Sequence, residues 1–335
     1  MSEILTIGAV TQDIFFPTSE GVAYDTPEDL LSQKKLAFEL GSKCHIAQRH
    51  EALGGCSANV ACGLAKLGED VSMYGCIGDD AVGKWISKEL GKIGVNLSLV
   101  CVQNNCQSDL SAIVVDEKSS DRVIFTNQIA NQKLIVQEEK IGRPHWIFVG
   151  DLTGEWQKNI DTIISTSNKN KIKVAFNPRQ STIHEDVKKI IETITHCEIL
   201  FVNKDEAVEI VSGCGDIAVR ELLENEEYLV KILHRLGARM ITITDGIRGA
   251  WAYDGHRIIH AEALLTDAVD STGAGDAFTS GFFTAHLKRM DLETCLRWGV
   301  ANSSNSLKEY GGQAGLLGEK EIEILANKVS VKLLN

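Results

Sequence analysis

The sequence lacks the features that would mark a membrane, secreted or nucleic-acid-binding protein. No apolar run reaches the ~18 residues that a membrane-spanning helix needs, and the opening stretch MSEILTIGAVTQDIFF has no basic leader. Basic residues are in the minority, 34 against 46 acidic ones, which gives a net charge of −12. Such a charge argues against nucleic acid or an anionic membrane surface as a partner. We therefore expect neither partner.

Cysteine is present, but not in the spacing of a metal site. The chain holds nine cysteines and no CxxC. An odd count in a long chain favours reduced thiols in the cytosol. We expect most of these cysteines to be small buried core residues of a cytoplasmic protein.

Short apolar runs alternate with amphipathic stretches along the chain. Strands are expected at 4–10, 71–78, 146–150, 172–178, 199–203 and 240–246. Helices are expected at 57–67, 80–93, 156–167, 184–195, 204–212, 217–236, 292–309 and 319–328. This alternation is typical of an α/β protein with a mostly parallel sheet and helices on both faces. Ligands of such sheets bind beyond the carboxyl ends of the strands.

One region departs from the alternation. Residues 111–116 and 122–126 flank the polar turn EKSSD, which is typical of an antiparallel hairpin. With further strands from 13–16 and 36–46, the hairpin would form a small β lid; the alternative is a set of edge strands of the main sheet. The proposed division assigns 1–12, 47–96 and 127–335 to the body, and 13–46 and 97–126 to the lid.

Two glycine-rich segments lack a residue that a known nucleotide motif requires. GDDAVGKW (78–85) resembles the phosphate loop GxxxxGK[ST], but Trp85 has no hydroxyl for Mg²⁺ and Asp79 and Asp80 would repel phosphate. We expect Asp80 to cap a helix instead. GAGDAF does not complete GxGxxG, because Phe278 replaces the third glycine. A dinucleotide site is therefore disfavoured.

The stretch DSTGAGDAFTSGF (270–282) is predicted to be a tight loop that opens a buried helix. Gly273, Ala274 and Gly275 are small enough for close approach to a ligand, and their N–H groups can bind an anion. Asp276 lies in the first helical turn, where the pKa of a carboxylate is normally lowered. An ionised base beside an anion cradle suits attack of a hydroxyl on a phosphoryl group. The alternative is a capping aspartate.

Two other segments carry candidate polar groups. In GGCSANVACGLAKLG (54–68), Asn59 could bind a polyol; the alternative is a cap or a surface amide. In VNKDEA (202–207), Asn203 and Glu206 have a spacing that can hold hydrated Mg²⁺ through water. The alternative there is a capping box.

DSTGAGDAF, with GGCSANVA upstream, resembles the PfkB or ribokinase family of carbohydrate kinases. Further matching segments follow in order: GAVTQD (8–13), GDDAVGK (78–84), NPR (177–179), VNKDEA (202–207), TDG (244–246) and ANSSNSLKEYGG (301–312). The resemblance implies a Rossmann-like three-layer αβα sandwich with a small β lid. It also implies transfer of the γ-phosphate of ATP to a hydroxymethyl group.

The resemblance also implies roles for matching residues. Asp276 would be the catalytic base, beside an anion hole of Gly273, Ala274 and Gly275. Substrate hydroxyls would be bound by Asp13, Gly54, Gly55 and Asn59. Phosphates and Mg²⁺ would be organised by Asn203 and Glu206, and the nucleotide would lie near Thr244, Gly246 and Asn302. A monovalent-cation loop, for K⁺, would map to Asp270, Thr272, Ser306, Gly311 and Gly315.

The substrate is less closely defined. Cys56-Ser57 replaces the Lys-Gly that follows the glycine pair in ribokinase, and the substrate motifs favour a neutral polyol. An acidic sugar would need an arginine, for which Arg122 and Arg179 are the candidates. The alternatives are a nucleoside, with a base stacked on Phe15, Phe16 or Phe125, and a catalytically silent sensor. Because β lids have open edges, a homodimer through the lid is expected.

Overall fold

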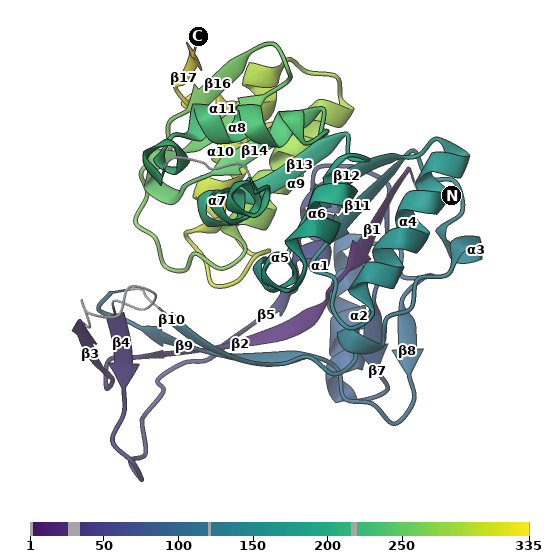
Figure 1. The fold of residues 1–335 in the computed structure, drawn as a ribbon. Coiled ribbons are helices and arrows are strands. Elements are labelled where there is room, and N and C mark those ends of the chain that lie inside the picture. The colour runs from purple at the N-terminus through teal and green to yellow at the C-terminus, as the bar shows by residue number, and fades with distance from the viewer. Residues whose placement is uncertain (1–2, 26–33, 120–121, 216–219, 335) are drawn as a thin grey trace.

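The computed structural model describes residues 3–25, 34–119, 122–215 and 220–334. Within these residues, the body is a nine-stranded sheet with helices on both faces (Figure 1). In sheet order its strands are β17 (Val331–Leu334), β16 (Ile258–Ala261), β15 (Ala250–Tyr253), β14 (Met240–Thr244), β13 (Ile199–Asn203), β12 (Lys173–Asn177), β11 (Trp146–Gly150), β1 (Ile4–Gly8) and β6 (Val71–Tyr74). Strands β14 to β6 of this order are parallel, and β15, β16 and β17 continue antiparallel. The expected α/β class is confirmed.

The sheet separates two apolar cores because side chains alternate between its faces. On β11, Phe148 belongs to one core, and Ile147 and Val149 belong to the other. The Phe148 face is covered by α1 (Cys56–Lys66), α2 (Ala81–Ile93), α9 (Ala274–Leu287), α10 (Leu292–Ser306) and α11 (Glu319–Ala326). The other face is covered by α3 (Glu138–Ile141), α4 (Trp156–Asn170), α5 (Gln180–Glu185), α6 (Val187–Ile194), α7 (Lys204–Gly213) and α8 (Glu226–Arg235). In the parts of the chain given above, no helix is long and apolar enough to cross a membrane.

Three expected elements are interrupted. The helix expected at 184–195 breaks at Asp186, whose side chain accepts a hydrogen bond from the Lys189 N–H and so caps α6. The strand expected at 71–78 divides into β6 and β7 (Cys76–Gly78), and β7 pairs with β8 (Cys101–Gln103). In the helix expected at 217–236, residues 217–219 lie outside the described residues, and a 3₁₀ turn precedes α8. The short 3₁₀ turns are η1 (Asn131–Lys133), η2 (Arg220–Glu224) and η3 (Gly246–Arg248).

A separate four-stranded sheet extends away from the body (Figure 1). Its order is β10 (Arg122–Asn127), β9 (Leu110–Asp116), β2 (Thr11–Thr18) and β5 (His50–Gly54). The β9–β10 hairpin confirms the pairing expected around EKSSD, and the edge-strand alternative is wrong. β5 was not expected, and its pairing with β2 places 50–54 in this small sheet rather than in the body. We refer to this sheet as the lid.

The lid ends in a second, two-stranded sheet. It consists of β3 (Val22–Asp25) and β4 (Lys34–Ala37), paired antiparallel. Residues 26–33 between them lie outside the described residues. Of the strand expected at 36–46, only the first two residues are in β4, and the rest has no regular structure. On β10, the apolar side chains of Val123, Ile124 and Phe125 are exposed.

Helix α9 crosses its neighbours at unusually short range because glycines lie at the crossings. A Cβ on Gly63 of α1 would lie 2.1 Å from the Ser280 Oγ, and one on Gly281 would lie 2.6 Å from the Trp298 carbonyl oxygen. A Cβ on Gly299 of α10 would lie 2.7 Å from the Phe278 ring. Side chains at these crossings would push α9 away from α1 and α10. The glycines therefore determine where the first turn of α9, with Asp276, is held.

This packing predicts opposite effects for two substitutions of helical glycines by alanine. Gly281→Ala should lower the free energy of unfolding by about 1–3 kcal/mol, because the new methyl group meets a backbone carbonyl. Gly91→Ala is the matched control: a Cβ there meets nothing within 4 Å, so stability should rise by about 0.4–1 kcal/mol. Urea denaturation of both variants measures the difference. Equal stabilisation by the two substitutions would contradict the close crossing.

Candidate active site

A cavity of about 240 Å³ lies at the carboxyl ends of the parallel strands, where ligands of such sheets bind. It is lined by Asn177, Phe201, Val202, Asn203, Glu206, Thr242, Thr244, Gly273, Gly275, Asp276, Phe278 and Thr279. Strands β12, β13 and β14 end at this cavity, and the first turn of α9 closes it. The structure thus brings together six of the predicted residues: Asn203, Glu206, Thr244, Asp276, and Gly273 and Gly275 of the anion hole. The Thr242 hydroxyl, which is buried, has no partner among the described residues and is available to a ligand.

Asp276 is half-buried in the first turn of α9. Its Oδ2 accepts a hydrogen bond of 2.7 Å from the Asn59 side chain, and Asn59 is itself held by the Gln313 amide. Burial raises the pKa of Asp276 to about 6, against the lowering effect of the Asn59 and Cys56 hydrogen bonds, and the Asp151 and Asp13 carboxylates raise it further. The expectation of a lowered pKa is therefore wrong. Loss of water outweighs the field of the helix terminus.

The loop before α9 leaves backbone open to the cavity. Gly273 has φ of 76°, a left-handed conformation that favours glycine, and it is the N-cap residue of α9. Nothing lies within 4 Å of the point where a Cβ on Gly275 would sit. The Ala274 N–H donates a long hydrogen bond, 3.4 Å, to the Ser271 carbonyl. N–H groups of a first helical turn have no intrahelical acceptor, so this backbone can receive an anion.

The lid supplies the next group of predicted residues. Asp13 on β2 is buried, and its carboxylate lies directly over the backbone of Gly54 on β5, where a Cβ would lie 2.2 Å from the Asp13 Oδ2. Burial raises the pKa of Asp13 to about 6, while a Ser111 hydrogen bond lowers it and Asp270 raises it. Gly55, with φ of 88°, caps α1 and so leads the chain from the lid to Asn59. The four predicted substrate residues thus form one continuous group.

Asn203 and Glu206 form the capping box that sequence reasoning left open. The Asn203 Oδ1 accepts from the Glu206 N–H at 2.9 Å, and the Glu206 Oε2 accepts from the Asn203 N–H at 2.9 Å. Both residues nevertheless line the cavity. Burial raises the pKa of Glu206 to about 7, against the Asn203 hydrogen bond, and Glu209, Asp276 and Asp205 raise it further. A nearby cation would favour the charged carboxylate.

A second cavity, of about 350 Å³, adjoins the first and is mainly apolar. Its lining includes two of the predicted nucleotide residues, Thr244 and Gly246, and two of the predicted anion hole, Ala274 and Gly275. It also includes residues that sequence reasoning missed: Ile247, Ala263, Leu264, Leu265, Val300, Ser303 and Ser304. Asn302 does not line it. Asn302 is fully buried: its Nδ2 donates to the Ala277 carbonyl and its Oδ1 accepts from the Leu317 N–H, both at 2.9 Å. The Asn302 side chain thus links α10 to α9. It does not line the cavity in which a nucleotide contact was predicted.

Asp270 ties the loop before α9 to the segment after α10. Its Oδ1 accepts from the Thr272 N–H and hydroxyl at 3.0 and 2.8 Å, and its Oδ2 accepts from the Gly311 N–H at 3.0 Å. The Ser306 hydroxyl instead donates to the Ser303 carbonyl. Three residues of the predicted cation loop, Asp270, Thr272 and Gly311, therefore come together. Ser306 instead forms its hydrogen bond within α10.

Several candidate substrate groups are already engaged. The Arg179 guanidinium donates to Gln128 at 2.9 Å and pairs with Asp151 at 3.2 Å. The Arg122 guanidinium, on the lid, contacts the Ser271 hydroxyl in the loop before α9. Phe15 is fully buried between the lid strands and packs on the Tyr310 ring, so it is not available to stack a nucleobase, whereas Phe125 is exposed.

Known proteins are similar to this chain in sequence and in fold. The chain is 25% identical to a ribokinase of Haemophilus influenzae over 277 residues, 81% of this chain and 86% of the relative. It is 25% identical to a nucleoside kinase of Methanocaldococcus jannaschii over 281 residues, 83% of this chain and 86% of the relative. A solved structure of Arabidopsis thaliana ribokinase complexed with ribose and ATP matches with a TM-score of 0.76 and 21% identity, covering 97% of this chain and 98% of that one.

Fold and site together define a phosphotransferase with an alcohol group as acceptor, built on the ribokinase fold. The sequence pattern of the pfkB family carbohydrate kinases matches residues 29–317, and the chain belongs to that family.

The pKa of Asp276 predicts the acid limb of the pH profile. A general base at Asp276 would have to be ionised, so kcat would then fall about tenfold per pH unit below pH 6 and level off above it. Asn59→Ala removes a hydrogen bond that lowers this pKa and should move the limb to higher pH. Asp13→Asn removes a nearby negative charge and should move it to lower pH. Steady-state rates of all three proteins between pH 4.5 and 8.5, about two units on either side of that pKa, test this; an unmoved limb in both variants would exclude Asp276 as the titrating group.

Proposed function

We propose that this protein transfers the γ-phosphoryl group of ATP to a hydroxymethyl group of a small sugar. The observation that carries the proposal is the Asp276 carboxylate, held by Asn59 at the edge of a cavity and next to the open backbone of the α9 loop. With a pKa of about 6, Asp276 is ionised at neutral pH. It is nevertheless a stronger base than an ordinary aspartate.

In the proposed reaction, Asp276 takes the proton of the substrate alcohol. The alcohol oxygen forms a bond to the γ-phosphorus as the bond between that phosphorus and the bridging oxygen of ADP breaks, and ADP carries away the electron pair. The first-turn N–H groups from Gly273 to Gly275 stabilise the negative charge on the transferring group, aided by the α9 dipole. The apolar second cavity, which begins at Thr244 and Gly246, would hold the adenine and ribose.

Mg²⁺ and a monovalent cation belong to the same proposal. Glu206 and Asn203 would hold Mg²⁺ through water, and Mg²⁺ when bound neutralises phosphate charge. The raised pKa of Glu206 fits this role, since the buried carboxylate lacks a cationic partner among the described side chains. Asp270 is likewise buried and is met only by neutral donors in the described part of the chain, so K⁺ beside it would offset its charge.

A neutral polyol is the favoured acceptor. Asp13 and Asp151 lie close enough to Asp276 to raise its pKa, and all three carboxylates can accept hydrogen bonds from hydroxyl groups. Both candidate arginines have other partners, which disfavours an acidic sugar. A nucleoside is the second candidate, supported by the exposed Phe125 ring on the lid.

An ADP-release screen over pentoses, hexoses, keto-deoxy acids and nucleosides tests the substrate class. We expect neutral sugars to give the highest rates, with a further increase when K⁺ is supplied. Higher rates with nucleosides would favour the second candidate, and binding without turnover of any acceptor would indicate a silent sensor.

With the acceptor found in this screen, Asp276→Asn should reduce kcat by about 10²–10⁴. The substitution keeps size and removes the base, so ATP should still bind, as calorimetry can verify. Asp205→Asn is the matched control, because Asp205 is also an acidic residue in the first turn of a helix but does not line the cavity. Wild-type turnover in Asp276→Asn would refute the assignment of the base.

We also propose that two copies associate through their lids. β10 is the edge strand of the lid sheet, and its side chains at Ile124 and Phe125 are 46% and 63% exposed. An open strand edge with exposed apolar side chains favours pairing with a second chain.

Ile124→Lys should therefore convert a dimer to a monomer in sedimentation velocity. Ile324→Lys on α11 is the control, because Ile324 is 67% exposed but lies outside the lid. A wild-type protein that sediments as a monomer, or equal effects of the two substitutions, would rule the lid dimer out.

A further inference from the structure

A large cavity lies at the opposite end of the sheet from the candidate active site. Its volume is about 1050 Å³. Its lining includes the first residues of four strands of the sheet: Ile4, Trp146, Lys173 and Met240. The lining of the candidate active site instead includes the last residues of strands β12, β13 and β14. α9 connects the two ends, since its 14 residues span about 21 Å from the anion-hole loop to His286 and Leu287.

Cations are concentrated around this cavity, although the protein as a whole is strongly acidic. Its lining holds the lysines and arginines Arg143, Lys171, Lys173, Arg257, Lys288 and Arg289, and the histidines His145 and His286. The carboxylates of the lining are Glu3, Glu69, Asp254 and Asp291. Burial raises the pKa of Glu69, against the lowering effect of Lys288. Basic groups at a helix C-terminus are favourable, and α9 ends at this point.

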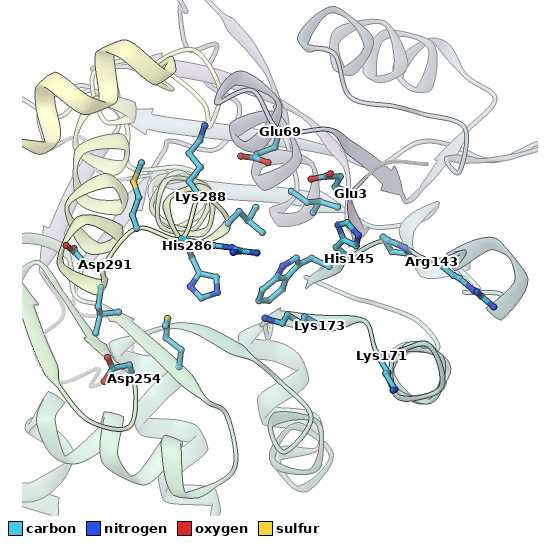
Figure 2. A pocket seen from close by; sticks show the side chains of 18 of the residues that line it. Glu3, Glu69, Arg143, His145, Lys171, Lys173, Asp254, His286, Lys288 and Asp291 are labelled. Atoms are coloured by element: carbon cyan, nitrogen blue, oxygen red, sulfur yellow. The ribbon is translucent and has the colours of Figure 1, made fainter.

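Three of the basic groups surround one opening (Figure 2). The side chains of His286, Lys173 and His145 lie around it, and Lys288 lies on the same side as His286. The buried Trp146 ring connects two of them: the Lys173 Nζ lies 5.1 Å from its centroid, and the His286 ring meets it edge-on at 5.5 Å. These contacts hold the two basic groups on a rigid wall.

The positive charge of this wall is incompletely neutralised by the protein. Lys173 pairs with Glu198 at 3.6 Å, but Glu198 is shared with Arg239 at the same distance. Arg289 and Lys171 form no ion pair with any described residue. Burial and the Lys173 ammonium lower the pKa of His286, with Glu198 acting weakly in the other direction. An anion placed in the opening would relieve this repulsion.

We propose that this cavity is a binding site for a small organic phosphate, separate from the catalytic site. Lys173 and His286 would bind its phosphate group, with Arg289 and His145 beside them. A phosphate carries close to two negative charges at neutral pH and accepts hydrogen bonds on three oxygens, which matches several converging donors better than a single carboxylate would. The cavity volume leaves room for an organic group beyond the phosphate.

The catalytic site would also bind phosphate, so the test needs a signal from this cavity alone. Histidine-labelled full-length protein is titrated with inorganic phosphate and with pyrophosphate, and the imidazole resonances are followed by NMR. The His286 signal is assigned from a His286→Gln spectrum. We expect a saturable movement of His286 and a rise of its pKa, because a bound anion favours the imidazolium form.

Lys173→Met should weaken this binding at least about tenfold, because it removes a charge-assisted hydrogen bond while keeping the aliphatic contact with Trp146. Lys169→Met, on an exposed lysine that pairs with Glu138 outside the cavity, should leave it unchanged. Arg289→Gln repeats the test if Lys173→Met does not fold. An unmoved His286, equal affinity in Lys173→Met and wild type, or a response confined to histidines outside this cavity would overturn the proposal.

Discussion

Removal of water from the Asp276 carboxylate is the physical constraint on which the site depends. A carboxylate at a helix N-terminus would ordinarily be a weak base, because the helix dipole and the N–H groups favour its charged form. Here burial outweighs both effects and raises its pKa to about 6. That burial exists because α9 is drawn close to α1 and α10 by glycines at the crossings. The glycines at the helix crossings therefore affect both the packing of α9 and the pKa of Asp276.

The lid is part of the site and not only a cover for it. Asp13 on β2 and Gly54 on β5 come from lid strands, and the chain passes from Gly54 through the left-handed Gly55 directly into α1, which carries Asn59. A movement of the lid would therefore shift Asp13 relative to Asp276 and change the repulsion between the two carboxylates. The contact of Arg122 with Ser271 joins the outer lid to the loop before α9. These contacts therefore link the position of the lid to the surroundings of the Asp276 carboxylate.

Two strands with continuous apolar runs, β11 and β13, were predicted with the bounds that the structure shows, because parallel strands are buried on both faces. Other predicted strands extend past the observed ends, as for β1, which was expected at 4–10 and ends at Gly8. The short antiparallel strand β5 lacks that signal, and its pairing depends on β2, which lies far away in sequence. The residues of the catalytic cavity were found from local motifs. The pKa of Asp276 was not, because Asn59 and Asp151, which help to set it, lie 217 and 125 positions away. Local spacing carries no information on such desolvation.

The charge distribution follows the direction of α9. Its N-terminus carries partial positive charge and gathers Asp276, and Asp13 and Asp151 lie close enough to act on that carboxylate. Its C-terminus carries partial negative charge and gathers His286, Lys288 and Arg289. The chain has a net charge of −12, yet lysines, arginines and histidines outnumber carboxylates around the C-terminal end of this buried helix. Because a rigid, close-packed helix shifts as a unit, a ligand that moves its C-terminal end would also move Asp276 relative to Asn59.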